Sequence, residues 1–83
     1  MAFKLSISKF ADIFEDLPDG TIIEFIKEND DPIKMEIVDR KTDSYKITYR
    51  GGSILNNIPI QYQYFEDTIK IKVDGKDITG EVS

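Results

Sequence analysis

Residues 21–50 read TIIEFIKENDDPIKMEIVDRKTDSYKITYR, a stretch in which apolar and polar side chains repeatedly alternate. Alternation with a period of two is the pattern of a β-strand that buries one face. The residues that interrupt it are mostly Asn, Asp, Pro, Lys and Thr, and the Asn, Asp and Pro among them favour turns. The stretch therefore predicts three strands joined by two hairpins, with the strands at 21–27, 33–40 and 44–50.

Two segments nearer the C-terminus, 58–65 and 68–74, alternate in the same way and predict two further strands. Residues 51–57 precede them and begin with Gly51 and Gly52, which predicts an irregular connection. Short loops join antiparallel neighbours, because parallel strands need a long crossover. We therefore expect an antiparallel meander of about five strands.

The lengths of the turns predict which residues face each other across the meander. They pair six residues of the apolar faces: Phe25 with Met35, Ile37 with Ile47, and Tyr64 with Ile69. A slip of one residue in any hairpin would move a whole apolar set to the opposite face. Because all three hairpins agree, they predict one continuous buried face, which also includes the tyrosines Tyr45, Tyr49, Tyr62 and Tyr64.

A short helix is predicted before the strands, at 8–17, with Ser8 as its N-cap. Its apolar residues follow helical spacing, at Phe10, Ile13, Phe14 and Leu17. Pro18-Asp19-Gly20 then ends it in a turn. The expected fold class is α+β and mainly β, in one domain spanning 1–83. The sheet is expected to be either a small barrel of the SH3 or Sm-like kind or a curved open sheet, with the helix packed against it.

The composition excludes several kinds of chemistry. The 83 residues include no Cys, no His and no Trp, and their formal net charge is −5. Without Cys and His the chain has no thiolate nucleophile, no Ser-His or Cys-His pair and no zinc site of the usual kind. The acidic loop at 28–31 lacks the spacing and the central Gly of a calcium loop. We expect no enzymatic activity, no cofactor and no metal.

Basic side chains gather on the outward face of the predicted sheet, although the chain is acidic. Six of the eleven basic residues fall at outward strand positions, while most carboxylates belong to the helix and loops. One interpretation is a surface that binds nucleic-acid phosphates or an acidic protein. The other is an ordinary solvated sheet face, which Glu24 and Glu36 share. The candidate residues are Lys34, Lys46, Arg50, Lys70 and Lys72, with Arg40 as the sixth outward basic residue.

Four apolar residues are also predicted to point outward: Phe65, Val38, Ile22 and Ile26. Gathered together and exposed, they would form a contact with a partner protein or a second copy of the chain. The alternative is that they are scattered singly or covered by the helix and the terminal segment, in which case they carry no function.

These features favour a non-enzymatic protein-binding module, an inhibitor or adaptor that acts through its sheet face or an edge strand. The alternatives are a small-barrel module that binds nucleic acid through the basic face, and a homo-oligomeric structural subunit. Abundant Ile and Lys with scarce Arg are typical of an AT-rich genome, such as that of a Gram-positive bacterium or its phage. No apolar run is long enough for a membrane helix, and we expect a cytoplasmic protein.

Overall fold

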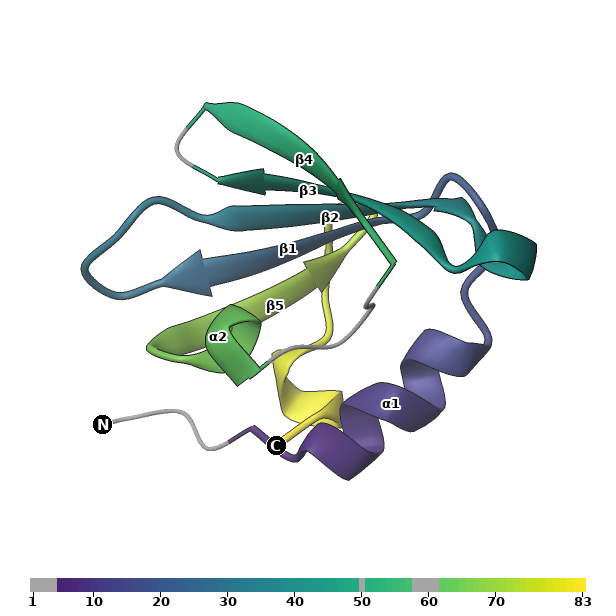
Figure 1. Ribbon diagram of the computed structural model, residues 1–83. Helices are drawn as coiled ribbons and strands as arrows, with labels where there is room; N and C mark the ends of the chain where they lie inside the picture. Colours follow the sequence, from purple (N-terminus) through teal and green to yellow (C-terminus); the bar gives the residue numbers. More distant parts are fainter. Residues whose placement is uncertain (1–4, 50, 58–61) are drawn as a thin grey trace.

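The computed structural model describes residues 5–49, 51–57 and 62–83 (Figure 1). Within these residues the chain has two short 3₁₀ turns, at Arg40–Thr42 and Thr79–Glu81. Its helices and strands, in order, are α1 (Ile7–Glu15), β1 (Ile22–Lys27), β2 (Ile33–Asp39), β3 (Ser44–Tyr49), β4 (Gly52–Asn56), α2 (Tyr62–Phe65), β5 (Thr68–Val73) and β6 (Lys76–Asp77).

Within the described residues the strands form one six-stranded antiparallel sheet in the order β4-β3-β2-β1-β5-β6. The first four strands follow one another as a meander, and β5 returns to pair with β1 on its other side. No described strand joins β4 to β6, so the sheet is open. The expected fold class is confirmed, with the curved open sheet in place of the barrel.

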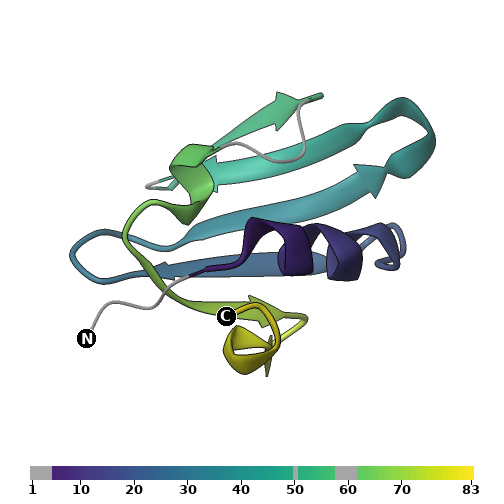
Figure 2. The same cartoon turned by 90° about the horizontal axis from the view of Figure 1, so that it is seen from below.

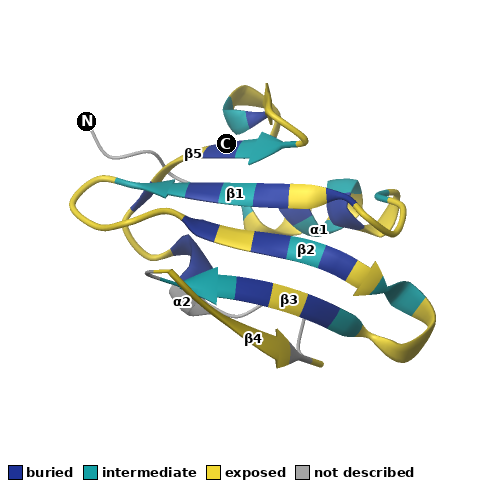
Figure 3. Cartoon of the chain, turned by 90° about the horizontal axis from the view of Figure 1, so that it is seen from above, coloured by how far each residue is buried: buried dark blue, intermediate teal, exposed yellow. Residues whose placement is uncertain are grey.

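Both helices lie on the same face of the sheet, which is the inner, buried face (Figures 1 and 2). Along β1, β2 and β3 buried residues alternate with more exposed ones, as a half-buried sheet requires (Figure 3). Ser6 rather than Ser8 caps α1, since its hydroxyl accepts a bond from the backbone N–H of Lys9. The backbone N–H of Ser6 donates to Val82 at 2.6 Å, which ties the start of α1 to the C-terminal segment.

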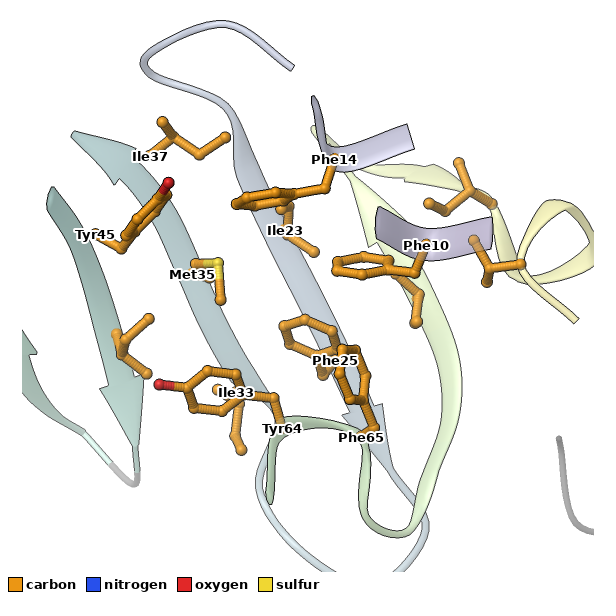
Figure 4. Close-up of a cluster of buried hydrophobic side chains, with 14 residues drawn as sticks. Phe10, Phe14, Ile23, Phe25, Ile33, Met35, Ile37, Tyr45, Tyr64 and Phe65 are labelled. Carbon is orange, nitrogen blue, oxygen red and sulfur yellow. The ribbon is translucent and has the colours of Figure 1, made fainter. Parts of the chain in front are cut away.

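Aromatic rings form a continuous chain of contacts beneath the sheet (Figure 4). Phe10 of α1 is its centre, with ring centroids 5.9 Å from Phe14, 5.7 Å from Phe25 and 5.3 Å from Phe65. From Phe14 the chain reaches Tyr45 of β3, and from Phe25 it reaches Tyr64 of α2. These contacts join both helices to the strands.

The predicted strand at 58–65 is wrong where the structure describes it. Residues 58–61 lie outside the described residues, and Tyr62–Phe65 form the helix α2 instead. Phe65 is therefore not an outward residue, because the helix turns it into the core, where it is 8% exposed. The predicted pairing of Tyr64 with Ile69 is also wrong, since β5 pairs with β1 and Ile69 is exposed.

The predicted irregular connection at 51–57 is wrong in the same region, because Gly52–Asn56 form the strand β4. Gly51, immediately before it, has φ +83°, a left-handed conformation that glycine adopts without steric cost. That freedom lets the chain turn back after Tyr49 and place β4 beside β3.

The hairpin registers differ from the predicted ones by two residues, which preserves the buried face. Ile23 rather than Phe25 faces Met35, and Tyr45 rather than Ile47 faces Ile37. In the β2–β3 hairpin a bulge lies between Ile37 and Asp39, and the Asp39 carboxylate holds the following turn by accepting the N–H of Lys41 at 2.9 Å. The hydrophobic pattern determines which face is buried but not the absolute register.

Replacing Phe65 and Ile69 tests the corrected region, because the sequence pattern and the structure assign them opposite environments. We expect Phe65→Ala to lower the free energy of unfolding by about 3 kcal/mol, since it leaves a cavity between Phe10 and Phe25. Ile69→Ala, at a residue 39% exposed, should cost about 0.5 kcal/mol or less. Urea denaturation measures both, and the reverse order of the two costs would contradict this packing.

Candidate protein-binding edge

The two edges of the sheet differ in length and in charge. The edge strand β6 has only two residues, both charged and both exposed. The opposite edge strand, β4, has five residues with the sequence Gly-Ser-Ile-Leu-Asn, and none of them is charged. An edge strand that is charged or very short resists pairing with strands of other chains. The strand β4 is neither charged nor very short. In the described part of the chain β4 is paired on one side only, with β3.

Two apolar side chains of β4 are exposed. Ile54 is 52% exposed and Leu55 is 68% exposed. Successive residues of a strand point to opposite faces, so one of the two lies on each face of the sheet. Figure 3 draws β4 at one edge of the sheet in the colour of exposed residues. The edge therefore combines a strand available for pairing with apolar side chains above and below it.

Ile54 ends an apolar row that crosses the inner face of the sheet. The pairing register places Val73, Ile23, Met35, Ile47 and Ile54 side by side on five neighbouring strands. Ile23, Met35 and Ile47 are completely buried, whereas Ile54 is half exposed because no described strand follows it. An apolar residue on an added strand would continue this row.

The outer face carries glutamates placed between its basic residues. Across the strands Lys34 faces Glu24, which in turn faces Lys72, and Lys46 faces Glu36. Lys72 also faces Asp77, and Lys70 forms an ion pair with Asp77 at 3.9 Å. Opposite charges placed directly across strands stabilise a sheet and lower its attraction for polyanions. Of the candidate basic residues, Lys34, Lys46 and Lys70 are exposed, Lys72 is half-buried, and Arg50 lies outside the described residues.

Arg40 is held by α1 instead of facing outward. Its guanidinium donates to the backbone carbonyls of Phe14 and Leu17 at the end of the helix, with Cζ 4.8 Å from the centre of the Phe14 ring. A cation at this position stabilises a helix C-terminus, and α1 has no basic residue of its own there. Arg40 is therefore committed to the fold.

The four apolar residues predicted to point outward do not form one patch. Ile22 and Val38 are exposed, at 39% and 45%, Ile26 is half-buried, and Phe65 is in the core. Glu36 is the residue directly opposite Ile22. The strand β4, which sequence reasoning missed, exposes more apolar surface than any member of this set. Its signal in the sequence was the uncharged run at 52–57 after a glycine turn.

A pocket of about 420 Å³ opens at one end of the sheet, lined by Lys27, Asp30, Asp31, Ile33, Tyr49, Glu66 and Asp67. Lys27 Nζ donates to the backbone carbonyls of Tyr64 and Glu66, both at 2.6 Å, and to Thr68 Oγ1 at 2.9 Å. Burial lowers the pKa of Lys27, although the carboxylates of Asp67, Glu66 and Asp30 oppose this shift. Lys27 thus holds the end of α2, as Arg40 holds the end of α1.

Comparisons of the chain with protein-family models, with curated proteins and with solved structures find no match. None of the helices among the described residues has both the length and the apolar character needed to cross a membrane. The same residues contain no group of three or more His, Cys, Asp or Glu side chains that could hold a metal ion.

Removing the Lys27 ammonium tests its role in holding α2. Lys27→Met leaves the carbonyls of Tyr64 and Glu66 without this donor, and we expect it to lower the free energy of unfolding by about 1–3 kcal/mol. Lys34→Met, at an exposed position of β2, is the matched control and should cost about 0.5 kcal/mol or less. Equal costs in urea denaturation would argue that Lys27 is only a surface lysine.

The carboxylate of Asp77, on the β6 edge, allows a separate prediction about pH. The hydroxyl and the backbone N–H of Thr79 donate to Asp77 Oδ1, and these bonds hold the pKa of Asp77 below its ordinary value of 3.8. A pKa lowered by folding contributes stability above the unfolded value, and this contribution is lost as the pH falls through the folded pKa. We expect Thr79→Val to raise the Asp77 midpoint in a carboxyl NMR titration, and an unchanged midpoint would contradict the assignment.

Proposed function

We propose that the chain is a protein-binding module, acting as an inhibitor or adaptor, which binds an extended segment of another protein as an added strand beside β4. The observation that carries this proposal is the contrast between the two edges of the sheet. The uncharged edge β4 exposes Ile54 and Leu55, whereas the charged β6 edge has two residues. In strand addition, backbone hydrogen bonds supply affinity and side-chain contacts on alternate positions supply specificity.

The chemistry of the edge specifies what the bound segment should contain. An apolar side chain opposite Ile54 would continue the row that runs through Ile47 and Met35. A small apolar residue would cover Leu55 on the other face, where Lys46 is its neighbour on β3. The preferred segment is therefore extended, apolar and uncharged, and it contains no proline at positions that bond to β4.

The alternating charges of the outer face argue against the nucleic-acid alternative. Each of Lys34, Lys46 and Lys72 lies directly opposite a glutamate, so a phosphate chain crossing this face would meet a repelling carboxylate beside each of these lysines. Modules that bind single-stranded nucleic acid combine a basic groove with exposed aromatic rings on which the bases stack. Of the three tyrosines whose burial the structure describes, Tyr45 and Tyr64 are buried in the core, and Tyr49 is partly buried against it.

Selection from a displayed library of random peptides tests the proposal directly. We expect the selected peptides to have apolar residues in alternating positions, and to protect the amides of β4 from hydrogen exchange. Binding should fall at least about tenfold for Ile54→Lys and for Leu55→Lys, because each adds a charge to the pairing edge. Val38→Lys changes another exposed apolar residue, on β2, which β3 separates from β4, and should leave binding unchanged.

Three results would contradict the proposal. They are the selection of no peptide, equal binding by Ile54→Lys, and protection of amides on another element. Oligonucleotide binding in low salt that Lys34→Ala and Lys46→Ala abolish would favour the nucleic-acid alternative instead. Thermal melts of each variant are the folding control, and we expect them to match the wild type because Ile54 and Leu55 are exposed.

A further inference from the structure

We propose that β4 also pairs with β4 of a second copy of the chain, antiparallel and about a two-fold axis at Ile54, and that this self-pairing competes with the segment bound in the proposed function. The competition rests on the proposed function, whereas the self-pairing does not. A two-fold interface joins the same surface on both copies, so it requires an edge that is complementary to itself.

The residues of β4 meet this requirement when the axis passes through Ile54. In that register Ile54 faces Ile54 of the second copy, Ser53 faces Leu55, and Gly52 faces Asn56. The apolar row Met35–Ile47–Ile54 of one copy then continues into the identical row of the other. Paired β-branched residues stabilise adjacent strands, and each Ile54 would lose the exposure that leaves it 52% accessible.

The charges around the edge permit this contact. The strand β4 carries no charge, and the nearest charged residue placed by the register is Lys46, beside Leu55. Across the axis Leu55 faces the neutral Ser53, so no like charges are brought directly opposite each other. The net charge of −5 on each copy gives a long-range repulsion that salt screens. Self-pairing should therefore tighten as salt is added, the opposite of phosphate binding.

The small size of the edge makes the pairing weak and reversible. A stable interface buries about 800 Å² on each partner, and a five-residue strand with two exposed apolar side chains covers far less than that. A weak self-contact leaves β4 free at low concentration and occupied at high concentration. A segment that pairs more tightly would displace the second copy, so the self-contact sets the affinity that a segment must exceed in order to bind.

Sedimentation at a series of concentrations tests the self-pairing. We expect the wild-type chain to form dimers reversibly, and Ile54→Lys to weaken the dimer at least about tenfold, because it places two lysines face to face on the axis. Ile54→Glu should weaken it in the same way, and mixing equal amounts of the two variants should restore a dimer. Val38→Lys is the matched control and should dimerise as the wild type does.

A cysteine introduced at the axis measures the register, since the chain has no cysteine of its own. Antiparallel neighbours lie about 4.5–5.5 Å apart between Cα atoms, a distance that a disulfide can span. Ile54→Cys should therefore form a cross-linked dimer on mild oxidation. Leu55→Cys should not, because the two copies of residue 55 would lie about 8 Å apart, two residues out of register.

A wild-type chain that is monomeric at every concentration would overturn the inference, as would a dimer that survives Ile54→Lys. A mixture of the lysine and glutamate variants that stays monomeric, or Leu55→Cys cross-linking as readily as Ile54→Cys, would overturn the axis at Ile54. The proposed function fails separately, in the peptide selection. A monomeric chain that binds peptides along β4 removes only this inference, whereas a dimer that binds none removes only the proposed function.

Discussion

Phe10 touches three other aromatic rings, and through them it joins α1 to β1 and α2. The core of this small chain depends on these ring contacts, since both helices place aromatic side chains against the same face of the sheet (Figure 4). Edge-to-face and offset rings add stabilisation beyond the area they bury. A sheet covered on one face only has its other face in solvent, which explains why Lys and Glu occupy many of the outer positions.

The helices that supply these rings depend in turn on cations from elsewhere in the chain. The last turn of α1 contains Glu15 and no basic residue, which opposes the helix dipole. Arg40, at the end of β2, donates to the carbonyls of that turn. Lys27, at the end of β1, holds the last carbonyls of α2 in the same way. Two basic residues thus lock the helices to the sheet, and neither is free to form a binding surface.

The fold class and the buried face could be predicted from the sequence because both depend on the parity of the alternation. Parity survives a shift of two residues, and both predicted hairpin registers in residues 21–50 are shifted by that amount. The absolute register of the β2–β3 hairpin was beyond sequence reasoning, because the bulge after Ile37 depends on a turn held by the Asp39 carboxylate. Local patterns contain no sign of that contact.

Residues 51–65 show where pattern reasoning fails. The segment at 58–65 alternates like a strand, but its last residues form a helix because Phe65 packs beneath the sheet against Phe10 and Phe25. In β4 the two large apolar residues are adjacent, so the sequence shows no alternation there that would predict a strand. The strand is recognised only from its pairing with β3 in the structure. The candidate binding edge was missed for this reason. An edge strand has one neighbour instead of two, so its sequence is the least constrained by packing.

The lack of constraint on β4 makes its composition informative. A strand that only had to end the sheet would tolerate lysine or glutamate at Ile54 and Leu55, since both side chains are largely in solvent. Charge at those positions would also protect against aggregation, which the opposite edge achieves with Lys76 and Asp77. Two apolar residues on an open edge are therefore unfavourable for the isolated chain, and the proposed pairing with another strand would remove them from solvent.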